Sequence, residues 1–219
     1  MKRTRTDFPQ WLSKLVSQRD VKKKLQSYSR RNYDSNLGVS EAFLTSILRQ
    51  TCSDFMGVYS SRDQTVPIPE THKTKNHYYI FNLEPSKTTK KSTGHFVALL
   101  LTPNQLIYYD PLGRSPYDAG NGEDHRHRGL HLFIEALCLF THRACYYYKD
   151  QDQNEDSTFC GLFCMLRILY HYAKYVKQLD LKPLEFYRNP NQLHKNEDLC
   201  IGYLKKLIHF LPELNYVKI

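Results

Sequence analysis

The chain has 219 residues, of which 41% are hydrophobic, and it contains 17 Tyr and 11 Phe. This length fits one domain with an appendage, and the composition excludes disorder over the whole chain. No apolar run approaches the roughly 18 residues of a membrane span. No apolar stretch of signal-peptide type follows the basic start MKRTRTDFPQW, so we expect a protein that is not secreted. We therefore expect its six cysteines to be free, catalytic or metal-bound rather than paired in a disulfide framework.

Most of the net charge of +9 lies at the N-terminus. Residues 1–31 carry ten Lys or Arg and two Asp, whereas the remaining 188 residues carry 21 basic and 20 acidic side chains. Such a cluster suits nucleic acid or another polyanion. The candidate DNA contacts in it are Lys22, Lys23, Lys24, Arg30 and Arg31. A solvated, solubilising face explains the same charges, because charge alone carries no sequence information.

Two helices are expected near the start of the chain. The first covers residues 8–27, with Pro9 in its first turn and a rough apolar stripe. The second is spelled SEAFLTSILRQTC, with Ser40 as its N-cap and Glu41 in its first turn. Residues 28–38 and 61–77 are predicted to be connections.

Aromatic and branched residues predict strands in the middle of the chain. The expected strands are 77–83 (HYYIFNL), 95–101 (HFVALLL), 105–110 (QLIYYD) and 144–149 (ACYYYK), and a tight connection at 102–104 joins the second to the third. Helical patterns follow at 130–142, 160–177 and 197–211. Strands followed by helices favour an α+β architecture, with a central mixed or antiparallel sheet flanked by helices.

The stretch DSTFCGLFC, residues 156–164, places two cysteines four positions apart. It is either part of a buried helix that contains sulfur or a reactive thiol at a helix start. The turn-forming run QNEDST precedes Cys160, which favours a helix that begins at this residue. The electropositive start of a helix stabilises a thiolate, and its unpaired N–H groups can donate to an oxyanion. Gly161 would let a substrate approach the backbone closely.

A thiol nucleophile needs a base, and the base needs an orienting group. His95 stands at the entry of one predicted strand and Asp110 at the exit of the next, so a hairpin would bring the imidazole and the carboxylate together. Gln153 lies seven residues before Cys160, and its amide could complete an oxyanion hole. Each of these four residues also has a non-catalytic explanation. The histidine could be structural, the aspartate a turn residue, the glutamine part of a solvated loop and the cysteine a buried core residue.

The order and spacing of these residues resemble a known family. GHF at 94–96, YYDPLG at 108–113, a Gln before the cysteine and CGLFC at 160–164 are similar to the adenovirus maturation protease family, adenain. They resemble more distantly the SUMO-specific and related Ulp-type cysteine proteases, which share the order His, acidic residue, Gln, Cys. FMGVYSSRD at 55–63 and NEDLCIGYLKKLIHFLPEL at 196–214 extend the resemblance to about residues 54–219.

This resemblance implies a papain-like, adenain-like cysteine protease domain at 51–219, preceded by a basic helical extension at 1–50. His95 would be the general base, Asp110 its partner, Gln153 the oxyanion donor and Cys160 the nucleophile at the start of a central helix. Two departures stand out. Phe96 replaces the Trp that the family usually has after its histidine, and the acid is Asp where adenain has Glu.

Cofactors and partners follow from the same resemblance. The chemistry requires no cofactor, but adenain is activated by a short viral peptide, joined through a disulfide, and by DNA. Cys145 lies near the position of the peptide-linking cysteine, and an ordinary strand cysteine explains it equally well. For Cys164 and for the histidines of DHRHRGLH at 124–131, packing and a solvated loop are better explanations than a metal site.

We therefore predict a viral cysteine endopeptidase that cleaves capsid and core precursors, at Gly-containing sites, during virion maturation. It would act in the virion and the infected cell, with viral structural precursors as substrates, viral DNA and a peptide activator as partners, and no membrane. Two alternatives stay open. One is a deconjugating protease for ubiquitin-like or SUMO-like proteins, which would use the same four residues. The other is a non-catalytic DNA- or capsid-binding protein on this fold.

Overall fold

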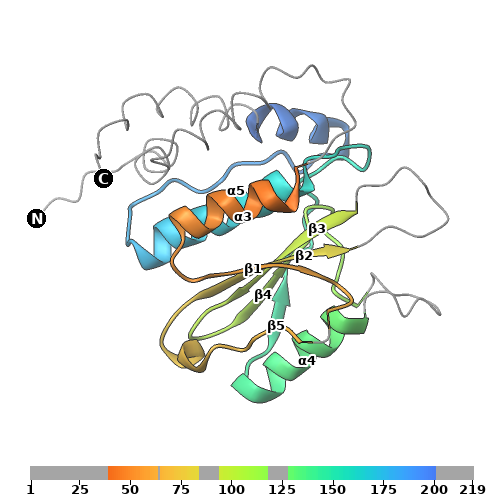
Figure 1. The fold of residues 1–219 in the computed structure, drawn as a ribbon. Coiled ribbons are helices and arrows are strands. Elements are labelled where there is room, and N and C mark those ends of the chain that lie inside the picture. The colour runs from red at the N-terminus through yellow and green to blue at the C-terminus, as the bar shows by residue number, and fades with distance from the viewer. Residues whose placement is uncertain (1–38, 64, 84–93, 118–127, 201–219) are drawn as a thin grey trace, which may run out of the picture.

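A five-stranded sheet lies between helices on both of its faces (Figure 1). The computed structural model describes residues 39–63, 65–83, 94–117 and 128–200. The strands are β1 (Phe55–Ser60), β2 (His77–Leu83), β3 (His95–Leu101), β4 (Leu106–Tyr109) and β5 (Cys145–Tyr147). The helices are α3 (Glu41–Thr51), α4 (Arg128–Thr141) and α5 (Cys160–His171), with a π-helical turn at Tyr172–Val176 and 3-10 turns at Glu70–Lys73 and Pro190–Gln192. A further helical stretch covers residues 193–200.

The sheet is mixed. Its strand order is β1-β2-β3-β4-β5, in which β2, β3 and β4 pair antiparallel, whereas β1 pairs parallel with β2 and β5 parallel with β4. A parallel pair needs a long crossover, which the segment before β2 and the segment containing α4 supply. The predicted α+β class, with a mixed sheet flanked by helices, is confirmed.

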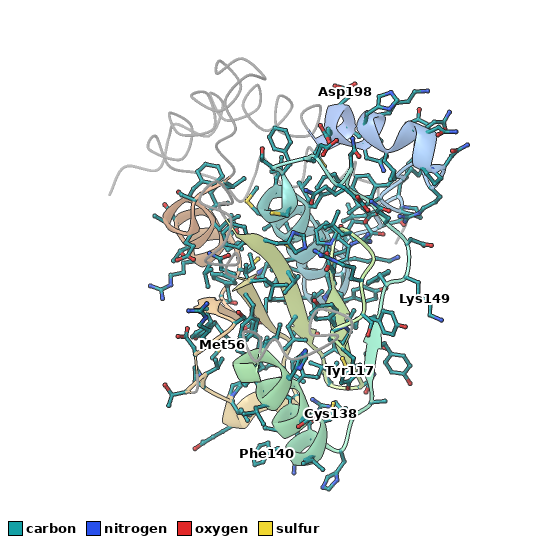
Figure 2. The ribbon with its side chains drawn as sticks, turned by 90° about the vertical axis from the view of Figure 1, so that its right-hand side faces the viewer. Met56, Tyr117, Cys138, Phe140, Lys149 and Asp198 are labelled. Carbon is teal, nitrogen blue, oxygen red and sulfur yellow. The ribbon has the colours of Figure 1, made fainter. Side chains whose placement is uncertain are left out.

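Both faces of the sheet are buried, so the central strands are continuous apolar runs rather than alternating ones. Successive residues of β2 point to opposite faces. Tyr78 and Ile80 pack in the core that contains α3 and α5, and Tyr79 and Phe81 pack in the core that contains α4. Figure 2 shows Phe140 of α4 and Asp198 at opposite ends of the molecule.

Helix α3 begins as predicted. The Ser40 hydroxyl accepts a hydrogen bond from the Phe43 N–H at 3.2 Å, and Glu41 occupies the first turn. Its apolar stripe, including Leu44 and Leu48, packs in the same core as α5. Most of α3 therefore lies in the segment predicted as an extension and yet contributes to the core. The division of the chain into 1–50 and 51–219 stays a prediction, because residues 1–38 lie outside those that the structure describes.

The remaining predicted elements have different outcomes. The strands at 77–83, 95–101 and 105–110 and the helices at 130–142 and 160–177 are present with small shifts of their ends. The strand predicted at 144–149 is shorter, because only Cys145–Tyr147 pair with β4 at this edge of the sheet. Strand β1 was not predicted.

Several predictions fall on residues that the structure does not describe. The helix at 8–27 and the candidate DNA contacts Lys22, Lys23, Lys24, Arg30 and Arg31 lie outside the described residues, as does the last helix beyond residue 200. Within the described ranges, no helix has both the length and the apolar character needed to cross a membrane.

Candidate active site

Two neighbouring strand ends bring His95 and Asp110 together. His95 opens β3, and Asp110 directly follows β4, which pairs with β3 from Leu101↔Leu106 to Ala98↔Tyr109. The His95 Nε2 atom lies 2.6 Å from the Asp110 Oδ1 atom. The hairpin therefore produces the juxtaposition that the sequence spacing predicts.

Gly94 explains how the chain enters β3 at the histidine. Its φ of +81° lies in the left-handed region that favours glycine. A Cβ at this position would stand 2.1 Å from the side-chain oxygen of Asn82 on the adjacent strand β2. Asn82 in turn donates a hydrogen bond to Glu41 of α3 at 2.8 Å. The glycine before His95 is thus a requirement of the local backbone.

Asp110 is fully buried and both of its carboxylate oxygens accept hydrogen bonds. Oδ1 accepts from the Leu112 N–H at 2.8 Å as well as from His95, and Oδ2 accepts from Arg114 Nε at 3.1 Å. Burial alone would raise the pKa of Asp110, but the hydrogen bond and charge of His95, with Arg114 and the Leu112 N–H, lower it below its usual value. Asp110 is therefore a carboxylate at neutral pH.

The turn DPLG holds this carboxylate in place. The Gly113 N–H closes the turn on the Asp110 carbonyl at 2.9 Å, with Pro111 at its second position. Gly113 has φ +70°, and a Cβ there would stand 2.7 Å from the Lys149 carbonyl oxygen. Only glycine lets the turn pack this closely against the backbone that leads to Gln153.

Cys160 is the first residue of α5, as predicted. Its side chain is buried, and its Sγ atom accepts a hydrogen bond from the Phe96 N–H at 3.4 Å. Phe96 follows His95 directly, so the thiol lies beside the strand end that carries the imidazole. The first N–H groups of a helix have no acceptor within the helix. They are therefore suited to stabilise negative charge at the cysteine and on a bound carbonyl oxygen.

The turn that precedes α5 is shaped by a side chain of the predicted turn-forming run. Phe159 is the N-cap and makes no side-chain capping bond. The Ser157 hydroxyl accepts a hydrogen bond from the Phe159 N–H at 3.2 Å, which shapes this turn.

In the His95–Asp110 pair, the proton resides on His95 at neutral pH. Burial of the imidazole opposes its protonation, but hydrogen bonds to Asp110 and Cys160 and the charges of both outweigh burial, so the pKa of His95 is raised to about 9. Since Nε2 faces Asp110, the other ring nitrogen is the one available to Cys160. A protonated imidazole stabilises a neighbouring thiolate.

Gln153 lies in the loop between β5 and α5 and is buried. Its Nε2 atom donates to the Ser157 carbonyl at 2.7 Å, three residues before Cys160, and its backbone N–H donates to the Pro111 carbonyl at 2.9 Å. An amide group has two hydrogens, so one remains for a substrate oxygen. No hydrogen bond joins Gln153 to Cys160 among the described residues, and its role as an oxyanion donor stays a prediction.

Two other residues of the CGLFC motif belong to the core. Cys164 is fully buried and donates to the Phe96 carbonyl at 3.3 Å, and burial raises the pKa of its thiol well above the usual value. A Cβ on Gly161 would stand 3.1 Å from both Leu44 and Phe96. The glycine therefore serves the close packing of α5 against α3 and β3, which corrects the interpretation that it clears a substrate path.

Cys145 lies on edge strand β5 and is partly buried against the α4 core. Burial raises the pKa of its thiol to about 12, with Cys138 as the second cause, so the thiol is protonated at neutral pH. This environment fits an ordinary strand cysteine, and a disulfide to an activating peptide stays a prediction.

Within the described residues, no group of three or more His, Cys, Asp or Glu side chains could hold a metal ion.

Arg114 is a site residue that the sequence did not reveal. It pairs with Asp110 from four positions later, across the DPLG turn. In the sequence Arg114 is one basic residue in a polar loop, and nothing there indicates a partner. Its approach to Asp110 depends on the geometry of the turn.

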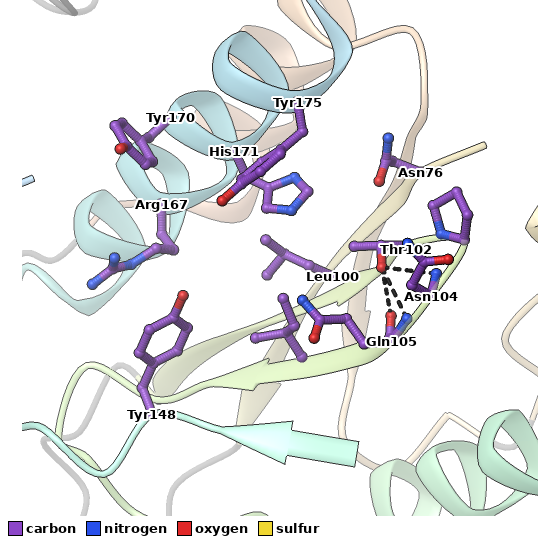
Figure 3. Close-up of a pocket in the computed structure, with 12 residues that line it drawn as sticks. Asn76, Leu100, Thr102, Asn104, Gln105, Tyr148, Arg167, Tyr170, His171 and Tyr175 are labelled. Atoms are coloured by element: carbon purple, nitrogen blue, oxygen red, sulfur yellow. Dashed lines mark hydrogen bonds between the residues drawn. The ribbon is translucent and has the colours of Figure 1, made fainter. Parts of the chain in front are cut away.

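A cavity of about 350 Å³ lies near the other end of α5 (Figure 3). Leu100, Thr102 and Gln105 line it from the hairpin, and His171 lines it from the helix. Burial and the nearby charge of Lys174 lower the pKa of His171 to about 4, so its imidazole is neutral and shares a 3.0 Å hydrogen bond with the Tyr78 hydroxyl. None of the three residues His95, Asp110 and Cys160 lines this cavity.

No family model and no curated protein matches the chain. Among solved structures, the chain is similar to ChlaDub1 from Chlamydia trachomatis, with 14% sequence identity and a TM-score of 0.35, over 99% of this chain and 85% of that chain. Values this low carry no conclusion about activity. The specific resemblance to the adenain family stays a prediction, and the chemistry of the site rests on its own geometry.

Proposed function

We propose that this chain is a cysteine protease whose nucleophile is Cys160. One observation carries the proposal: the Cys160 thiol at the start of α5 lies beside an imidazole that a buried carboxylate holds at 2.6 Å. A hydrogen-bonded base, its orienting acid and a thiol at a helix start are the components that thiol acyl transfer requires.

The reaction follows from these positions. The Cys160 thiolate attacks the carbonyl carbon, and the oxyanion forms next to the first N–H groups of α5 and the amide of Gln153. The C–N bond then breaks, His95 gives its proton to the leaving amine, and a thioester remains. Water attacks the thioester, His95 takes a proton from it, and the carboxylic acid product leaves as the thiolate re-forms.

Two substrate classes fit this chemistry. The first is the peptide bond of viral capsid and core precursors, cleaved at Gly-containing sites, as the resemblance to adenain implies. The second is the bond that joins a ubiquitin-like or SUMO-like protein to its target. Both use the same His, acid, Gln and Cys, so the positions of the catalytic residues favour neither.

The experiment offers both substrate classes to the full chain. Purified wild type is incubated with fluorogenic ubiquitin and SUMO probes and with extended peptides that contain Gly-Gly and Gly-X bonds. Cys160→Ala should lose turnover with every substrate, whereas Cys164→Ala, which alters the buried cysteine of the same helix, should keep it. Cleavage that persists in Cys160→Ala would contradict the assignment of Cys160 as the nucleophile. Wild type that cleaves neither class would contradict the proposal and favour a binding protein.

The partners and location belong to the same proposal. Viral DNA and an activating peptide would stimulate the enzyme, and it would act in virions and infected cells. Deleting residues 1–31 should abolish stimulation by DNA. Salt-dependent DNA binding that survives this deletion would exclude the basic N-terminal segment as the contact.

A further inference from the structure

A second buried carboxylate, apart from Asp110, has an unusual set of partners. Asp152, the residue before Gln153, is 1% exposed. Its Oδ2 atom accepts from the Tyr109 hydroxyl and from Arg167, both at 2.8 Å, and its Oδ1 atom accepts from Arg188. Its backbone carbonyl accepts from the Asn196 amide at 2.8 Å. A carboxylate buried this deeply has to be paired, and here two guanidinium groups pair with it.

Two of these partners, Tyr109 and Arg167, lie on the elements next to the catalytic groups. Tyr109 is the last residue of β4 and directly precedes Asp110, and Arg167 lies on α5, seven residues and about two turns after Cys160. The backbone N–H groups of Asp152 and Gln153 both donate to the carbonyl of Pro111, at 2.8 and 2.9 Å. Asp152 therefore connects the loop of Gln153 with the strand of Asp110 and the helix of Cys160.

The Arg167 side chain is fixed by burial and by two aromatic rings. Its side chain is 11% exposed, and its guanidinium group lies 4.7 Å from the ring centroids of both Tyr109 and Tyr148. Figure 3 shows Arg167 and Tyr148 at the edge of the cavity, beside α5 and near β5. Arg188 is less buried and also approaches the exposed Asp150, 3.6 Å from its Nε atom.

We propose that Asp152 is the positioning residue for Gln153, fixing its amide beside the first turn of α5 as an oxyanion donor. This inference rests on the proposed function. Such a donor is effective only when it is held in place before charge develops on the substrate oxygen. The loop is fixed on one side of Gln153 by the ion pairs of Asp152 and on the other by the bond from Gln153 to Ser157. Among the described residues, Asp152 makes no hydrogen bond to Cys160, so we assign it a positioning role through Gln153.

The test separates oxyanion stabilisation from thiol reactivity. Asp152→Asn keeps the shape but removes the charge, and it should lower kcat about 10²-fold with little change in KM, as expected when one oxyanion donor is lost. Alkylation of Cys160 by iodoacetamide develops no oxyanion, so its rate should stay within about twofold of wild type. Asp150→Asn, at a 63% exposed position in the same loop, is the matched control and should keep wild-type kcat.

A double-mutant cycle identifies the route of the effect. If Asp152 acts through Gln153, the double variant Asp152→Asn/Gln153→Ala should be no slower than Gln153→Ala alone. Losses that multiply would overturn the proposal, as would an alkylation rate that falls together with kcat. Arg188→Met removes a half-exposed partner of Asp152 and should reproduce the selective loss of kcat if Asp152→Asn does not fold.

Hydrogen exchange keeps this inference distinguishable from the proposed function. Asp152→Asn should increase exchange in peptides covering residues 149–157, because a loop without its ion pairs would open more often and break the hydrogen bonds from the N–H groups of residues 152 and 153 to the Pro111 carbonyl. Unchanged exchange together with unchanged kcat would show that Asp152 does not position the loop. Wild type without any turnover would instead reject the proposed function, and exchange would still decide whether Asp152 holds the loop.

Discussion

Replacing Asp110 with Asn tests how the carboxylate controls the imidazole. The substitution removes the negative charge that lies 2.6 Å from His95 Nε2 while keeping the size of the side chain. The hydrogen bond and charge of Asp110 are leading reasons why the pKa of His95 is raised from 6.5 to about 9. Without them, burial lowers the pKa and contact with Cys160 raises it, so the pKa of His95 in the variant should return to about its ordinary value of 6.5.

The magnitude follows from this shift. Moving the pKa from about 9 to 6.5 corresponds to about 3 kcal/mol in the protonation equilibrium of His95. At about pH 7.5 the imidazole would be about 97% protonated in wild type and about 9% in the variant. Because the protonated imidazole donates to the leaving amine, activity should fall about tenfold from this cause alone. At about pH 5.5 both proteins would be about 90% protonated or more, so this part of the defect should nearly disappear.

The assay is kcat/KM against pH for wild type and variant with the best substrate. Wild type should lose activity as pH rises through about 9, and the variant should lose it near 6.5. Arg114→Met serves as the control, because it removes the other charged partner of Asp110 but keeps the Asp110 charge beside His95. It should therefore not lower the pH at which kcat/KM falls on the alkaline side. Circular dichroism at each pH checks that the variants are folded. A ratio of wild-type to variant activity that does not change between these pH values would refute the reasoning.

Three further outcomes follow from the packing and the pKa shifts. Ser40→Ala should lower the free energy of unfolding by about 1 kcal/mol through loss of the α3 cap, measured by urea denaturation, and Ser40→Asn should retain it. Because the pKa of His171 is lowered to about 4, the unfolded chain takes up a proton below 6.5 that the folded chain does not. The contribution of His171 to stability should therefore be about 2 kcal/mol lower at about pH 5 than at neutral pH, and it is measured as the difference in pH dependence between wild type and His171→Gln, in which His95 is unchanged. In wild type, iodoacetamide should modify Cys160 long before Cys164, and mass spectrometry of the labelled peptides measures the order. Labelling of Cys164 first would contradict this prediction.

The sequence by itself determined the parts of this protein that depend on local patterns. Apolar runs such as HYYIFNL and HFVALLL predicted the central strands, and Ser40 before an amphipathic run predicted the start of α3. The juxtaposition of His95 and Asp110 was also predictable, because a hairpin of known spacing leaves little freedom in where its two ends lie. The position of Cys160 at the start of α5 followed from the turn formers that precede it.

Tertiary structure decided the rest, because the deciding contacts join segments distant in sequence. Strand β1 depends on parallel pairing with β2, which no local pattern specifies. Gly161 looked like an opening for substrate until the packing of Leu44 and Phe96 around it was seen. Arg114 and Asp152 read as ordinary polar loop residues, and only the folded chain brings one to Asp110 and buries the other between Arg167 and Arg188. A buried charge depends on partners from several elements, so its role becomes visible only when those elements are assembled.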